Sequence, residues 1–416
     1  MPTAAPRADR SPLDAFDPAR EAAPASASSR PRIASLDIMR GAVMVLMAID
    51  HVRVYSGLPP GGPTPGIFFT RWITHFVAPA FVFLAGTAAF LHGEKLGDRT
   101  RLARFLVTRG AWLVLLELTV LRLAWTFNVD YAHYLLAGVI WMIGWCMILM
   151  GGLVYLPRRA LILFAVALIA GHNVLDRLGP PTVAAIRSGS LGWLWKILYF
   201  GGSVKLGASG PPLVVLFSIV PWIGVMAAGY AFGPVMYMTP ERRRRICLAV
   251  GLGAIGAFLV LRGVDLYGDP RPWHLAPPNF PRLLAFLATN KYPASLLFLL
   301  MTLGPTIALL PLAERARSRA AGILATFGRV PFFYYLLHIP LIHVLACLVS
   351  LLREGRVNPW LFTNHPMMNP EAPPGYTWSL ALLYAVFLVA VVILYFPCRW
   401  FAELKSRTRS AWLSYL

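Results

Sequence analysis

Residues 35–57 combine a long apolar run with ionisable side chains that could do chemistry. The segment reads SLDIMRGAVMVLMAIDHVRVYSG, in which Arg40 and His51 are eleven residues apart. At about 100° per residue this spacing is three turns plus about 20°, so both side chains share one helix face, roughly 16 Å apart along the axis. Because an ionisable side chain inside a membrane is costly, each one calls for an explanation. One helix thus offers a cation near one end and an imidazole near the other.

The chemistry open to these residues follows from their types. An imidazole can serve as a general base or a nucleophile, so His51 is the first catalytic candidate. Asp50 could tune His51, although it lies about 100° round the helix from it. Asp37 is three residues before Arg40 and can pair with it. Structural roles are the alternatives: a histidine hydrogen-bonded within a bundle, and a neutralising pair at the membrane interface.

A second group of polar side chains follows at the start of the next apolar run. Arg71 and His75 are four residues apart and share a helix face, which makes His75 a further catalytic candidate. A purely interfacial role for His75 is equally open. His338 and His343 lie on a later apolar run, and since their spacing implies no shared task, we interpret them as structural.

The elements that position these residues are membrane-spanning helices. The chain is 57% hydrophobic and only 13% charged, about half the charged share of a soluble domain. Long apolar runs without alternation predict an all-α bundle of about ten transmembrane helices, and they make strands implausible. The runs are 35–56, 70–92, 104–125, 134–156, 159–176, 211–235, 244–263, 293–313, 330–352 and 376–399.

The placement of basic residues predicts the orientation of the chain. Arginine and lysine gather in every second connection between the runs, which by the positive-inside rule places both termini in the cytoplasm. Residues 1–31 contain no apolar signal segment and predict a disordered cytoplasmic tail. We therefore divide the chain into this tail, a transmembrane domain over 32–400 and a cytoplasmic C-terminal tail over 401–416.

Charge and cysteine usage exclude other classes of function. The net charge of +20 does not indicate a nucleic-acid partner, because no soluble basic domain remains once the spans are removed. The cysteines lack metal-ligand spacing, so we expect neither a metal site nor a disulfide framework. The cysteines are Cys146, Cys247, Cys347 and Cys398.

Several segments resemble known membrane acyltransferases. An arginine, ten residues and a histidine on the first span are similar to the signature of the acyltransferase three family, and FVFLAGTAAFL (81–91) resembles its second span. RIASLDIMRG (32–41) resembles the start of the catalytic domain of heparan-alpha-glucosaminide N-acetyltransferase. An uncharacterised bacterial membrane family related to that enzyme resembles the chain most, through PWIGVMAAGY (221–230), NKYPASLLFLLMTLGP (290–305) and FGRVPFFYYLLHIPLIH (327–343).

The resemblance implies acyl transfer across a bilayer in a bacterial inner membrane. Acetyl-CoA would act as co-substrate from the cytoplasm, and a hydroxyl or amine, on a glycan, would accept the acyl group on the other side. His51 would be the general base or a transient acyl carrier. Arg40, paired with Asp37, would form the CoA site together with Arg329, and the arginines would hold the phosphates. No metal or prosthetic group is implied.

One departure from the resemblance concerns a histidine in the outward loop after the first span. The loop 56–69 here contains none, which makes His75 the nearest substitute. We prefer His51, because it keeps the arginine–histidine spacing.

Two other classes of function stay open at the level of sequence. A transporter or exporter of a small or lipid-linked solute would also place charges within the membrane. Against it, no internal repeat is evident, and the polar residues concentrate in the first two spans. A catalytically silent assembly or regulatory subunit is the third possibility.

Overall fold

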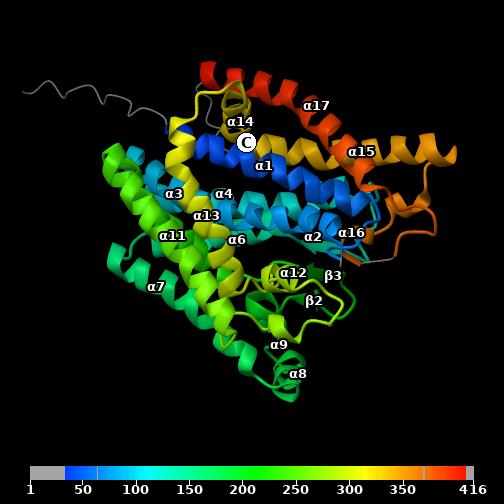
Figure 1. Cartoon of the computed structure of the whole chain (residues 1–416), viewed down its shortest axis with the longest axis horizontal. Coiled ribbons are helices and arrows are strands. Elements are labelled where there is room, and N and C mark those ends of the chain that lie inside the picture. The colour runs from blue at the N-terminus through cyan, green and yellow to red at the C-terminus, as the bar shows by residue number, and fades with distance from the viewer. Residues whose placement is uncertain (1–32, 63, 369–370, 409–416) are drawn as a thin grey trace, which may run out of the picture. The chain divides into compact units, whose positions relative to one another are not determined.

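Long helices form from the apolar runs in the computed structural model of the chain, which describes residues 33–62, 64–368 and 371–408 (Figure 1). The predicted tail over 1–31 and the last eight residues of the predicted C-terminal tail lie outside the described residues. The helices are α1 (Ala34–Tyr55), α2 (Pro65–Trp72), α3 (Val77–Leu96), α4 (Arg99–Leu116), α5 (Arg122–Thr126), α6 (Val139–Leu153), α7 (Arg158–Gly171), α8 (Pro180–Ser188), α9 (Gly192–Trp195), α10 (Val220–Phe232), α11 (Pro240–Val264), α12 (Arg282–Leu287), α13 (Leu296–Arg315), α14 (Arg319–Arg329), α15 (Pro331–Glu354), α16 (His365–Met368) and α17 (Leu380–Arg407).

Within the part of the chain that the structure describes, six helical segments are long and apolar enough to cross a membrane. They are Pro65–Leu96, Arg158–Arg177, Pro240–Val264, Leu296–Arg315, Pro331–Glu354 and Leu380–Arg407. The chain is therefore an integral, multi-pass membrane protein. Each of the ten predicted runs contains helix in the structure, but some of these helices carry several charges or are short, as α1 and α6 are. The count of about ten spans stays a prediction.

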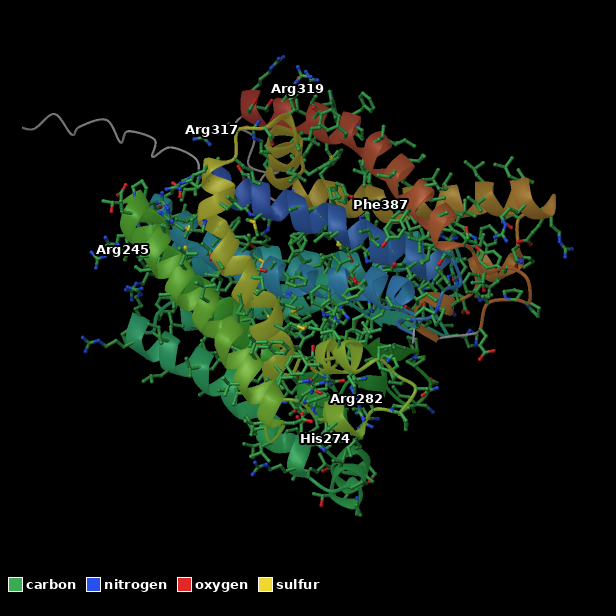
Figure 2. The ribbon with its side chains drawn as sticks, in the orientation of Figure 1. Arg245, His274, Arg282, Arg317, Arg319 and Phe387 are labelled. Carbon is green, nitrogen blue, oxygen red and sulfur yellow. The ribbon has the colours of Figure 1, made fainter. Side chains whose placement is uncertain are left out.

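Contacts between connections show which helix ends lie together. Arg99 donates to the carbonyl of Tyr155, and Arg158 donates to that of Ala231. Arg243, near the start of α11, pairs with Glu314 at the end of α13. Each contact joins helix ends or connections to which the sequence assigns the same side of the membrane. Figure 2 shows the labelled arginines of this end of α11 and α13, and at the opposite end the labelled residues of the 265–295 loop.

A small sheet lies outside the helical layer, and the expectation that strands are implausible is wrong for it. Strand β3 (Pro212–Val215) pairs in parallel with β1 (Leu135–Ala137) and antiparallel with β2 (Gly202–Lys205). β1 and β3 occupy the beginnings of two predicted spans, 134–156 and 211–235. These segments are too short to cross a membrane as strands, but their backbone groups still need partners, which pairing supplies.

Helix α14 differs from the expectation, because the basic residues between the predicted spans 293–313 and 330–352 indicate only a connection. It begins with a Ser318 cap that accepts from the amide of Ala321, and it packs along α1. The two backbones touch at glycines: an added Cβ would lie 1.8 Å from the Leu324 carbonyl oxygen at Gly41, and 1.7 Å from the Asp37 carbonyl oxygen at Gly328. Only glycine allows this approach, which holds α14 directly against α1.

Candidate active site

Helices α1 and α15 run parallel to each other and bring histidines together. Near the start of α1, Nη1 of Arg40 lies 3.5 Å from the carbonyl oxygen of Gly328, in the last turn of α14 and three residues before α15 begins. Further along, Nδ1 of His51 lies 2.6 Å from Nε2 of His338. At the end of α1, the ring of Tyr55 stacks on His343, with the centroids 4.7 Å apart. The three pairs occur in the same order along both segments of the chain, as expected when α15 runs parallel to α1.

The hydrogen bonds of His338 determine which nitrogen of His51 carries a proton. Nδ1 of His338 lies 2.7 Å from the carbonyl oxygen of Tyr335, and a carbonyl can only accept, so this nitrogen carries the hydrogen. In a neutral His338, Nε2 is then the acceptor, and His51 must donate to it from Nδ1. A neutral His51 therefore keeps an unprotonated Nε2. This is the nitrogen that a general base or a nucleophile uses.

Aromatic side chains surround the two histidines. The ring of Trp125 meets His51 edge to face at 4.7 Å, and Tyr335 lies on another side at 6.4 Å. His338 is fully buried, whereas His51 is only partly buried. The pair thus has one fully buried member, held by backbone carbonyls, and one that is partly exposed.

Asp50 points away from His51 and into a separate charged cluster. One carboxylate oxygen accepts from Nε of Arg53 at 2.9 Å, and the other pairs with Arg71. Arg53 also donates to the carbonyl of Leu58. The structure thus gives the Nδ1 of His51 to His338 rather than to Asp50, and Asp50 instead joins α1 to α2.

His75 lies on the opposite side of this cluster, on the 3₁₀ turn η1 (Ile73–Phe76). Its ring meets Phe298 of α13 at 5.4 Å, and it is within the electrostatic reach of Arg71, Asp50 and Lys291. Among the described residues, Nδ1 of His75 is buried without a hydrogen-bond partner. Arg71 and His75, predicted to share a face, therefore border the same cluster through different contacts.

The residues of the expected CoA site, Arg40, Asp37 and Arg329, lie on α1 and on the end of α14 that contacts it. Arg40 is 3.6 Å from Asp37, and the backbone of Asp37 touches Gly328, which is followed by Arg329 at the end of α14. Asp37 is buried, Arg40 keeps 21% of its side chain exposed, and Arg329 is exposed. Two arginines from separate helices thus lie near the contact between α1 and α14, and each is at least partly exposed.

The structure adds residues that sequence reasoning missed. His338 was interpreted as structural, and Lys291 passed as part of a loop, yet each lies beside a predicted candidate. The signal for His338 was its position within FGRVPFFYYLLHIPLIH, a segment that carries the family resemblance. Within the described ranges, no group of three or more His, Cys, Asp or Glu is placed to hold a metal ion.

Comparison with known families identifies the family of the chain. The family model described as heparan-alpha-glucosaminide N-acetyltransferase, catalytic, matches residues 32–263, more than half of the chain. The matched region includes α1 with Arg40 and His51, as well as α2 and η1. No curated protein matches the sequence. The chain belongs to the heparan-alpha-glucosaminide N-acetyltransferase catalytic family.

Proposed function

We propose that this protein is a membrane acetyltransferase that moves an acetyl group from acetyl-CoA to a hydroxyl or amine of a glycan acceptor. Membership of an acetyltransferase family supports the reaction class. The observation that carries the proposal is the hydrogen bond between His51 and His338, because it leaves Nε2 of a partly accessible His51 unprotonated. A structural histidine pair would need no such access.

In the proposed reaction, Nε2 of His51 removes the proton of the acceptor hydroxyl or amine. The acceptor oxygen or nitrogen forms a bond to the thioester carbonyl carbon, and the carbon–sulfur bond breaks. The CoA thiolate then takes the proton from the His51 imidazolium, so that CoA leaves as a thiol. His338 contributes by accepting from Nδ1 of His51 throughout, which orients the ring and stabilises the imidazolium.

The acetyl donor would bind between His51 and the start of α1. The pantetheine arm of CoA separates its thioester from its phosphates, and Arg40 lies about 16 Å along α1 from His51. Arg40 and Arg329 supply guanidinium groups of the kind that bind phosphate through paired hydrogen bonds. We place this end at the cytoplasmic face of a bacterial inner membrane, and the acceptor at the opposite face.

The experiment that tests this proposal measures acetyl-CoA binding and slow hydrolysis by the purified full-length protein in detergent. His51→Ala should bind acetyl-CoA and lose turnover by about 100-fold or more. Arg40→Ala should lose binding. His133→Ala, which alters an exposed loop histidine, is the matched control and should behave as wild type.

Two results would overturn the proposal. If His51→Ala folds and turns over acetyl-CoA at the wild-type rate, His51 is not the base. If no variant binds acetyl-CoA at millimolar concentration, the donor assignment fails. Counter-flow of a solute by reconstituted protein would then identify a transporter.

A further inference from the structure

A cluster of positive side chains lies next to His51, at the end of α1. Arg53 of α1 and Arg71 of α2 both pair with Asp50. Lys291, from the loop between α12 and α13, places its ammonium over the rings of Phe217 and Tyr292, at 5.7 and 5.3 Å from their centroids.

The second anionic candidate in the cluster is a phenol. The hydroxyl oxygen of Tyr292 is placed to accept a hydrogen bond from Arg71, and Lys291 is close enough to interact with it electrostatically. Three elements that are distant in the sequence therefore bring their charges to one place.

Even with Tyr292 ionised, this cluster would hold three cations against two anions, so its charges do not balance. Arg53, Arg71 and Lys291 are cations, and Asp50 is the carboxylate that both arginines share. The side chains of Arg53, Arg71 and Asp50 are 9%, 13% and 16% exposed, and Lys291 is 8% exposed. Buried cations in excess of carboxylates are unfavourable unless a further anion joins them. Burial accordingly lowers the pKa of Lys291, with repulsion from Arg71 acting in the same direction.

One member of the cluster is exposed at the protein surface. Tyr292, its outermost member, is 36% exposed, whereas Lys291 behind it is buried. On the inner side lies His75, whose Nδ1 has no hydrogen-bond partner among the described residues. An anion that enters past Tyr292 would meet Lys291 and Arg71, with the imidazole of His75 nearby as a further hydrogen-bonding group.

We propose that Arg53, Arg71 and Lys291 bind a carboxylate or phosphate group of the acetyl acceptor. This inference rests on the proposed function, which places the reacting acceptor atom at His51. Asp50 and His51 are consecutive residues, so a group held at this cluster lies close to the reacting centre. The CoA phosphates do not suit the site, because the pantetheine arm holds them away from the thioester and Arg40 provides for them elsewhere.

The site has a cost that can be measured. A lysine kept buried beside two arginines is retained at the expense of stability, as is common for binding groups. Lys291→Met keeps much of the side-chain volume and removes the charge. This variant should therefore melt at a higher temperature than wild type when no anion is present, whereas removal of a lysine that merely stabilises the loop would lower the melting temperature.

The test is thermal unfolding of the full-length protein in detergent with sugars that differ in charge. D-glucuronate and D-glucose 6-phosphate supply the carboxylate and the phosphate, and D-glucose is the neutral match. We expect each anionic sugar, at about ten times its dissociation constant, to raise the Tm of wild type by about 2 °C. D-glucose should not. Lys291→Met should lose the shift, and Lys205→Met, at an exposed lysine of β2, should keep it.

The possible results separate this proposal from the proposed function. Equal shifts in wild type and Lys291→Met, or no shift with either anion, would overturn the acceptor site while leaving acetyl-CoA turnover untouched. Lys291→Met that binds acetyl-CoA about tenfold more weakly would assign the cluster to the donor and also overturn the proposal. If the wild-type protein binds the anionic sugars but does not turn over acetyl-CoA, the acetyltransferase function is refuted instead.

Discussion

Nδ1 of His51 lies 2.6 Å from Nε2 of His338, although 287 residues separate them in the chain. We expect His338→Phe to lower kcat for acetyl transfer or acetyl-CoA hydrolysis by about 10- to 100-fold. The phenyl ring fills a similar space but cannot accept a hydrogen bond from Nδ1 of His51. The proton of a neutral His51 could then move to Nε2, which would leave no free nitrogen to act as the base. KM for acetyl-CoA should stay within about twofold, since Arg40 is distant. Steady-state kinetics of the purified protein measure both.

A conservative replacement distinguishes positioning from packing. The amide oxygen of a glutamine can accept from Nδ1 of His51, so His338→Gln should recover much of the kcat lost in His338→Phe. If the two variants lose activity equally, or if neither loses any, His338 does not position His51. Melting temperatures of both variants show whether a loss of activity reflects unfolding.

The phosphate-binding role of the arginines at the start of α1 is tested on α14. Arg329→Gln should raise KM for acetyl-CoA about tenfold, because it removes one charge-assisted hydrogen bond, and kcat should change little. Arg319→Gln alters an exposed arginine at the other end of the same helix and serves as the control (Figure 2). An equal rise of KM in both variants would indicate a general effect of surface charge rather than a site.

The contact between α1 and α14 implies that alanine substitutions at two glycines of α14 change the stability of the protein in opposite directions. Gly328→Ala places a Cβ 1.7 Å from the carbonyl oxygen of Asp37, so the helices must separate. We expect a loss of about 1 to 3 kcal/mol or more in stability. Gly322→Ala has no neighbour within 4 Å and should gain about 0.5 to 1 kcal/mol from helix propensity. Thermal unfolding in detergent compares them, and a Gly328→Ala protein as stable as wild type would contradict the packing.

The helical class could be predicted because it depends on local sequence. Continuous apolar runs have few alternatives to helices in a membrane, and Arg40 with His51 share a face by the helical repeat alone. The same reasoning failed for β1 and β3. Their residues are as apolar as a span, but they lie in connections where backbone pairing between distant segments decides the structure.

The partners of the candidate residues could not be predicted, because periodicity within one helix does not show which helix it faces. Arg71 was grouped with His75 by spacing, yet its ion pair goes to Asp50 on α1. His338 had no neighbour along its own helix that suggested a task. Lys291 lies in a connection, where a lysine is ordinarily explained by the orientation of the chain in the membrane. Its position near Asp50 depends on the tertiary fold.

A buried histidine outside the spans predicts how stability depends on pH. His365 is 4% exposed, stacks on Trp360 at 3.8 Å and lies beside Tyr55 and His343. Burial, with a smaller repulsion from His343, lowers its pKa from near 6.5 to about 3. The folded protein therefore excludes a proton that the unfolded chain takes up below pH 6.5.

The stability associated with His365 is thus complete above about pH 6.5 and falls as the pH decreases toward 3, by up to about 1.4 kcal/mol per pH unit. His365→Phe keeps an aromatic ring on Trp360 and cannot take up a proton. The melting temperature of this variant should fall less than that of wild type between about pH 7 and pH 5. If His365→Phe and wild type lose stability in parallel over this range, His365 is not the group that takes up the proton.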